Sequence, residues 1–505
     1  MLKIGQVYSA QKAHRKSVMQ AMHGILAQPG QPSDPNDKKG RPSGTDDIGM
    51  RSLGPGAPST EYFPFYAMSL EVGSTNAFAT VGKETPASTT AIHAGKHDSS
   101  SGLSTYDLAI ALQYGQGTGS AQLVKFMSDH VKMVHSPPYR NWKCILSAGT
   151  TSAFEIILRM LAKPDDYLLV EKYTYTTVFE TGLPLGVKFA QVRTDKDGLM
   201  PNDLDDILTN WDETVRGSKK PSLLYTIPTG QNPSGITQPL SRRQEIYRIA
   251  QKHNLFIVED DPYYFIQLGL YKTTSQVTEP PTSVEDYVKT LVPSYLSIDT
   301  DGRVLRMDSF SKIIAPGARM GWVTASEQVI ERMVRGHEVS VQNPSGFSQI
   351  AVFKLLHDSW GHLGFVQWLA HLRGEYTKRR DVLFEACELF LPREICRWVP
   401  STAGFFAWIS VDWTKHHKVG LMSSLQVEKE IHSAAIDAGT LVVPGSWFLP
   451  DEGKSGMDEV FFRMTYAAAS TDDIREAIRR FGAALRRVFH LQSQDSCSAV
   501  KSVSN

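Results

Sequence analysis

The chain is short of cysteine, of net charge and of long hydrophobic runs, and each shortage excludes a class of protein. Only four of its 505 residues are cysteines and none forms a C-x-x-C pair, so we expect reduced thiols in an intracellular protein without a metal site. Basic and acidic residues both number 53, and this balance gives no general reason to bind nucleic acid. No run of about 18 apolar residues is present, which predicts that no segment spans a membrane.

Acidic residues are also missing from residues 1–33, where four basic residues occur. This composition is compatible with a mitochondrial transit peptide. A flexible arm ahead of the first domain is the simpler interpretation. We therefore expect a cytoplasmic protein, with a mitochondrial location as the alternative.

From about residue 106, amphipathic segments alternate with short apolar runs, which is typical of an α/β domain with a mainly parallel sheet. After about residue 345 the pattern becomes mixed, as in a smaller α+β domain. Residues 273–293, rich in Thr, Ser, Pro and Glu, interrupt the first pattern and suggest a surface insertion. The expected divisions are an arm over 1–50, an N-terminal segment over 51–105, a large domain over 106–345, a small domain over 346–490 and a disordered tail over 491–505.

Polar residues follow three of the predicted strands at the point where each strand ends. In open α/β sheets, ligands bind beyond the carboxyl ends of the strands, so these residues should converge at one edge. Asn232 follows the run 223–227, and Asp260 and Tyr263 follow the run 255–258. The run 304–307 is followed by Ser309, Ser311 and Lys312, with Arg319 seven residues further on.

This set of residues suits pyridoxal 5′-phosphate. Lys312 can bind the aldehyde covalently, and Asp260 can keep the ring nitrogen protonated. Asn232 and Tyr263 can donate hydrogen bonds to the phenolate oxygen of the ring.

A phosphate group needs hydroxyl groups, a cation and free backbone N–H groups. Ser309, Ser311 and Arg319 offer the first two. A Gly-Thr-Thr turn that opens an amphipathic run offers the third, because a helix N-terminus binds anions. This turn consists of Gly149, Thr150 and Thr151, and Tyr175, after the run 167–171, can stack on the ring.

The segments 225–235 (YTIPTGQNPSG), 258–265 (VEDDPYYF) and 307–322 (MDSFSK…PGARMGW) resemble fold-type I pyridoxal-phosphate aminotransferases. Within that class they most resemble the subgroup that holds the fungal aromatic and the kynurenine/2-aminoadipate aminotransferases, and the resemblance runs from about residue 50 to 488. It implies a large domain with a mainly parallel seven-stranded sheet and helices on both faces, plus a smaller α+β domain that includes 51–105. Lys312, Asp260 and Tyr263 would then be the catalytic residues.

The resemblance adds three residues that spacing alone does not indicate. Arg463 is similar to the arginine that binds the substrate α-carboxylate, and Asn232 is a second expected substrate-binding residue. Tyr114 is similar to a tyrosine that reaches the phosphate of the neighbouring subunit, which implies a homodimer. Gly56 lies in a turn near the substrate, and this turn departs from the usual Gly-Gly-Leu-Pro by carrying Pro55 and Ala57.

The expected activity is ping-pong transamination of an α-amino acid, aromatic by resemblance (Phe, Tyr, Trp), with an acceptor such as 2-oxoglutarate. Kynurenine, 2-aminoadipate, Leu or Met, or a substrate of secondary metabolism, are alternatives. Decarboxylation or elimination with the same cofactor stays open, because the reaction depends on which Cα bond is perpendicular to the ring. A DNA-binding regulator is disfavoured, since the first 50 residues show no helix-turn-helix pattern. An inactive scaffold is disfavoured by the complete set of Lys, Asp and Arg.

Overall fold

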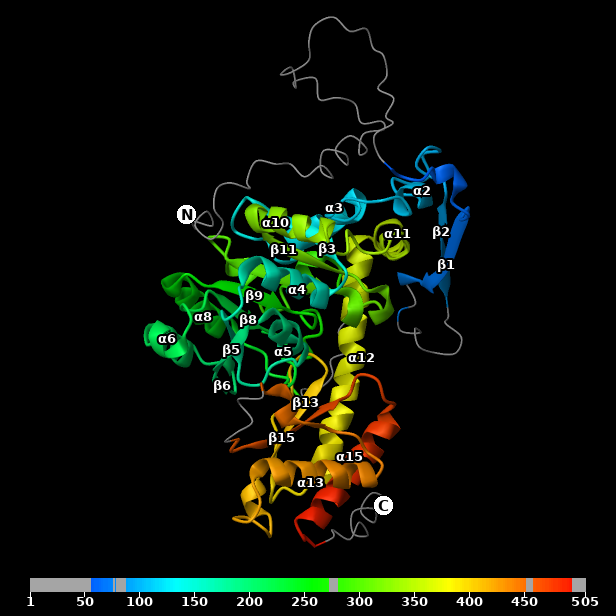
Figure 1. Cartoon of the computed structure of the whole chain (residues 1–505). Helices are drawn as coiled ribbons and strands as arrows, with labels where there is room; N and C mark the ends of the chain where they lie inside the picture. Colours follow the sequence, from blue (N-terminus) through cyan, green and yellow to red (C-terminus); the bar gives the residue numbers. More distant parts are fainter. Residues whose placement is uncertain (1–55, 76–77, 79–87, 272–279, 451–456, 493–505) are drawn as a thin grey trace, which may run out of the picture.

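The computed structural model describes residues 56–75, 78, 88–271, 280–450 and 457–492. The expected N-terminal arm, the last residues of the tail, the start of the expected insertion and the Gly54-Pro55 half of the substrate-side turn lie outside these residues. Elements are labelled as in Figure 1.

A seven-stranded sheet forms the centre of the large domain, with the strand order β3-β11-β10-β9-β8-β4-β5. Only β11 runs antiparallel to its neighbours, so the predicted mainly parallel sheet is confirmed. Its central strands are buried on both faces, which is why they appear in the sequence as continuous apolar runs. The strands are β3 Trp142–Ser147, β4 Tyr167–Glu171, β5 Lys188–Val192, β8 Leu223–Thr226, β9 Phe256–Asp260, β10 Val304–Ser309 and β11 Gly321–Ser326.

Helices cover both faces of this sheet (Figure 1). On one face, Phe154 of α4 contacts the ring of Tyr225 on β8, with 5.1 Å between the centroids. On the other face, Arg243 of α8 is fully buried and donates to Thr229, which follows β8. The helices of the large domain are α2 Leu108–Ala111, α3 Ala121–Val134, α4 Thr150–Leu161, α5 Thr177–Gly182, α6 Pro201–Thr209, α7 Glu213–Arg216, α8 Leu240–His253, α9 Val284–Val288, α10 Glu327–Glu338 and α11 Gly346–Phe353.

The small domain is an antiparallel sheet of order β12-β13-β15-β14 packed against helices. The long helix α12 runs from the large domain into the small one (Figure 1). Helix α15 has Asp472 and Asp473 in its first turn and Arg486 and Arg487 in its last, which suits the helix dipole. The elements are α12 Gly361–Phe390, β12 Cys396–Arg397, β13 Phe406–Val411, α13 Ser424–Asp437, β14 Val443–Pro444, β15 Val460–Thr465 and α15 Thr471–Val488.

Two segments make packing contacts that their expected divisions do not describe. The described part of the N-terminal segment contains a hairpin of β1 Ala67–Gly73 and β2 Thr89–Gly95, which packs against the π-helical segment η9 Lys354–Trp360 and away from the four-stranded small-domain sheet. The described part of the expected insertion contains α9, whose Tyr287 is buried and donates to the carbonyl of Phe265. The polar sequence of the expected insertion gives no local sign of this packing.

Candidate active site

Lys312 stands at the carboxyl end of β10, in the 3-10 turn η7 Phe310–Lys312. Ser309 holds this turn, because its hydroxyl accepts a hydrogen bond from the backbone N–H of Ser311 at 3.1 Å. The Lys312 side chain is partly buried. Burial lowers the pKa of its amine, and the positive charges of Arg319 and Arg463 lower it further, while Asp260 opposes them. A larger fraction of the amine is therefore neutral than in an exposed lysine.

Asp260 ends the neighbouring strand β9 and is buried. Its Oδ2 accepts a hydrogen bond from the Tyr225 hydroxyl at 2.6 Å, whereas its Oδ1 is buried without a partner. Burial raises the pKa of this carboxyl group to about 6. A buried acceptor without a donor raises the free energy of the folded protein, so a ligand that donates a cationic N–H group to Oδ1 would be stabilised there.

The N-terminus of α4 faces Arg319. Gly149 caps this helix without a side-chain hydrogen bond, so the backbone N–H groups that follow, at Thr150 and Thr151, lack a capping side chain. A Cβ atom on Gly149, where φ is +87°, would lie 2.8 Å from Nη2 of Arg319. Arg319 itself has a left-handed φ of +47°, a strained conformation that concentrates at binding sites. Its guanidinium group lies 3.5 Å from the Ser311 hydroxyl.

Arg463 enters the site from β15 of the small domain. Its Nη1 atom donates a hydrogen bond to Oδ1 of Asn232 at 2.8 Å, across the boundary between the domains. Its guanidinium carbon lies 4.7 Å from the ring centroid of Phe406 and 4.9 Å from that of Phe448. Two aromatic faces and one amide oxygen thus orient the cation while leaving other donors free.

The turn that carries Asn232 is held by a buried network. Glu171, at the end of β4, accepts hydrogen bonds from Thr226 at 3.0 Å and from Gln231 at 3.1 Å. Burial raises the pKa of Glu171 to about 7. Gly230 has a φ of +55°, and a Cβ atom there would lie 2.6 Å from the backbone of Gly404 in the small domain. The two domains are therefore in close contact beside the site.

Two predicted aromatic residues lie in the same region. Tyr263 is buried, and its ring contacts Phe405 and Phe406 at 5.3 and 5.7 Å. Burial raises the pKa of Tyr263, which keeps its hydroxyl group a donor. Tyr175 is close enough to Tyr263 for its hydroxyl to influence that pKa.

Neither Tyr114 nor Gly56 contacts the residues of this site within the described part of the chain. The side chain of Tyr114 is 58% exposed. Its neighbour Gln113 donates to the carbonyl of Pro58 at 2.8 Å, which connects Tyr114 to the segment of Gly56. A role for either residue at Lys312 would thus require a second subunit or a change in conformation.

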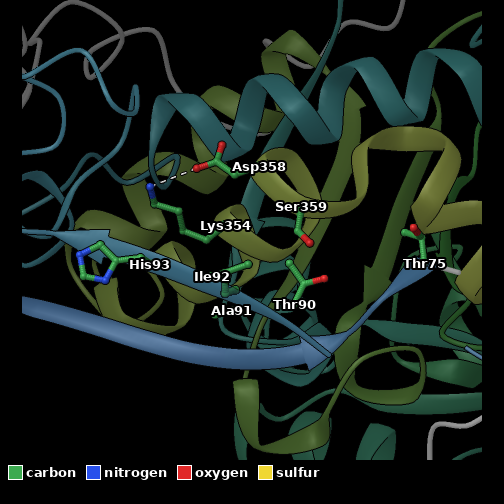
Figure 2. Close-up of a pocket in the computed structure, with 8 residues that line it drawn as sticks. All are labelled: Thr75, Thr90, Ala91, Ile92, His93, Lys354, Asp358 and Ser359. Carbon is green, nitrogen blue, oxygen red and sulfur yellow. Dashed lines mark ion pairs between the residues drawn. The ribbon is translucent and has the colours of Figure 1, made fainter. Parts of the chain in front are cut away.

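A cavity of about 300 Å³ lies elsewhere, between β2 and η9 (Figure 2). Lys354 lines it and forms an ion pair with Asp358 at 3.1 Å. None of its lining residues belongs to the predicted site. Among the described residues, no group of three or more His, Cys, Asp or Glu side chains is arranged so that it could hold a metal ion, and no helix is long and apolar enough to cross a membrane.

The residues present fit pyridoxal phosphate. The unpartnered Oδ1 of Asp260 suits a protonated ring nitrogen, and the glycine-lined start of α4 beside Arg319 suits a phosphate group. Sequence reasoning missed three contributors: Tyr225, which bonds Asp260, and Phe406 and Phe448, which flank Arg463. Tyr225 is the first residue of the motif 225–235, so the sequence could have indicated its place beside the site. No sequence motif marks Phe406 or Phe448 as site residues.

The family model described as aminotransferase class I and II matches residues 84–481. An aromatic amino acid aminotransferase of Schizosaccharomyces pombe is 40% identical over 449 residues, covering 88% of this chain and 92% of that protein. An L-tyrosine:2-oxoglutarate aminotransferase of Serpula lacrymans is 36% identical over 415 residues, covering 79% and 78%. The crystal structure of the aminotransferase Aro8 from Candida albicans has a TM-score of 0.85 at 36% identity, covering 96% of this chain and 98% of that one.

Proposed function

The chain belongs to the class I and II aminotransferase family, and from this premise we propose that it transfers the amino group of an aromatic α-amino acid to 2-oxoglutarate. It is a pyridoxal-phosphate-dependent enzyme. The observation that carries the substrate proposal is the position of Arg463 between the rings of Phe406 and Phe448. A carboxylate bound there has aromatic surface beside it, which suits an aromatic side chain. The names of the relatives support the same substrate class.

When bound, pyridoxal phosphate supplies an electron sink for the electron pair of the broken Cα–H bond. Nζ of Lys312 takes the Cα proton, which requires the neutral amine that burial favours. Arg463 binds the α-carboxylate in a bidentate manner and so orients the Cα–H bond. Oδ1 of Asp260, which has no partner among the described residues, would accept a hydrogen bond from the protonated ring nitrogen. Two half-reactions through one site give ping-pong kinetics.

We also propose a homodimer in which Tyr114 contributes to the partner's site. Several large apolar side chains of the same N-terminal region are exposed, including Tyr62 (84%), Tyr66 (76%) and Ile110 (44%), and exposed apolar surface of this kind is typical of protein interfaces. Equilibrium sedimentation tests the stoichiometry. Mixing inactive Lys312→Ala with weakened Tyr114→Ala should restore part of the activity if the site is shared. A mixture no more active than its components would contradict this proposal.

A cytoplasmic location is proposed as well, with the mitochondrion as the alternative. The three cysteines that the structure describes are free and buried, which is compatible with a reducing compartment. Cell fractionation of the full chain tests this, and a mitochondrial product shortened at its N-terminus would overturn it.

The decisive experiment is an absorbance spectrum of the purified protein with L-phenylalanine added, repeated with Lys312→Ala. The wild type should show the near-ultraviolet to blue band of the lysine-bound cofactor. Phenylalanine should bleach this band, and 2-oxoglutarate should restore it, whereas Lys312→Ala should lack the lysine-bound form.

Bleaching by 2-aminoadipate, kynurenine or leucine but not by phenylalanine would refute the aromatic substrate and keep the enzyme class. A product that has lost its carboxyl group as carbon dioxide would refute transamination.

A further inference from the structure

A cluster of buried charged side chains lies on the face of the main sheet opposite to Asp260. Parallel pairing of β9 with β10 aligns Arg306 with Glu259 and Met307 with Asp260. Successive side chains of a strand point to opposite faces. Asp260 therefore lies on the face of α4, and Glu259 and Arg306 lie on the other face, one residue away along each strand.

Arg306 is the centre of this cluster, and its side chain has no exposed surface. Its Nε and Nη2 donate to the two carboxylate oxygens of Asp308 at 2.9 and 2.7 Å. Its Nη1 lies 3.0 Å from Glu259 and 3.4 Å from Asp261. Three carboxyl groups thus surround one guanidinium group, so the acidic groups are in excess directly behind Asp260.

The surroundings hold the acidic groups in place, and the positive charge of Arg243 reduces their excess over the cations to one negative charge. Glu259 accepts hydrogen bonds from the backbone N–H groups of Tyr295 and Leu296. Oδ2 of Asp261 accepts from Thr229 at 2.9 Å, and Oδ1 of Asp261 is buried without a partner. Arg243 donates its hydrogen bonds to carbonyl and hydroxyl oxygens and not to these carboxylates. The other titratable or charged groups that face the cluster are His135, Arg243, Tyr264 and Tyr295.

We propose that Asp308 and Asp261 are positioning residues for the cofactor: their charges, anchored by Arg306, strengthen the hold of Asp260 on the protonated ring nitrogen. The inference rests on the proposed function and concerns residues that do not touch the cofactor. Burial raises the pKa of Asp260 to about 6, Asp308 acts in the same direction, and Arg306 opposes it. Charges act over several ångströms in a medium of low dielectric constant, so this influence reaches through the sheet.

The test uses the holoenzyme with pyridoxal phosphate and compares the wild type with Asp308→Asn and Asp261→Asn. The measured quantity is the midpoint pH of the absorbance change in the near-ultraviolet to blue band of the lysine-bound cofactor. Removing the negative charge of Asp308 disfavours the cationic cofactor, so this pH should fall by about half a unit to one unit in Asp308→Asn. The shift in Asp261→Asn should be smaller, because burial raises the pKa of Asp261 to about 7 and this carboxyl group is only partly ionised near neutral pH. Asp261→Asn is the milder variant, because its amide nitrogen can occupy the unpartnered position of Oδ1. Asp308→Glu, which keeps the charge, should titrate like the wild type.

Asp299→Asn is the matched control. Asp299 is also a buried carboxylate, but it accepts from the backbone of Val304 at the start of β10 rather than at its end. This variant should leave the titration unchanged.

An unmoved titration in both test variants, an equal shift in Asp299→Asn, or loss of folding in both test variants would show a purely structural role and overturn the inference. A wild type without the band would refute the proposed function and the inference together. A wild type that shows the band, with both test variants changing at the same pH as the wild type, would refute the inference alone.

Discussion

Replacing Arg463 by glutamine should lower kcat/KM for L-phenylalanine about a hundred- to ten-thousand-fold. The guanidinium group is held by Asn232 at 2.8 Å and by the rings of Phe406 and Phe448, which leaves its remaining donors for a carboxylate. Two hydrogen bonds to a charged group contribute about 1.5–3 kcal/mol each, or about 3–6 kcal/mol together. Because Arg463 is only partly buried, solvent screening favours the lower end of this range.

The assay is steady-state kinetics combined with the absorbance half-reaction, with cofactor content measured by the same band. Arg463→Lys keeps the charge but loses the planar fork, so its loss should be intermediate. The control is Arg475→Gln on α15, where the arginine is about half-exposed and pairs with Asp472. A loss of less than about tenfold for Arg463→Gln, or an equal loss for Arg475→Gln, would refute the assignment of Arg463 as the carboxylate-binding residue.

Two further predictions concern the scaffold. Gly230→Ala should unfold at a lower temperature than the wild type and lose activity, because its Cβ atom would lie 2.6 Å from the backbone of Gly404. Gly217→Ala is the control, since Gly217 has a similar φ of +62° but open space around it. This control should lose only about 1–2 kcal/mol of stability through backbone strain and keep full activity. Equal effects in the two variants would contradict the role of this contact. Burial lowers the pKa of His130 from 6.5 to about 3, so the unfolded chain binds a proton that the folded chain excludes. This contribution to stability is complete above about pH 6.5 and is lost towards pH 3, by about 1.4 kcal/mol per unit. Neither ring nitrogen of His130 has a partner, so His130→Phe should make thermal unfolding less dependent on pH, and an unchanged dependence would contradict this origin.

The parts of the site that were predictable lie at the ends of single strands. Asp260 and Lys312 each follow an apolar run, and the parallel alignment of β9 and β10 brings both residues to the same edge. Arg463 could be named only through family resemblance, because its strand belongs to the small domain. The strands β3 and β5 were not predicted from their sequences, and pairing with neighbours in the sheet supplies what their local pattern lacks.

The sequence alone was enough to predict the alternation of strands and helices, the family and the residues that follow each strand. These are local properties, since the period of the apolar residues and the identity of the next polar residue are written along one segment. The contacts between groups on distant segments became known from the folded structure. Phe406 and Phe448 flank Arg463, and Arg306 gathers three carboxyl groups behind Asp260. Such contacts depend on how sheets and domains pack, and the sequence carries no local pattern for that packing.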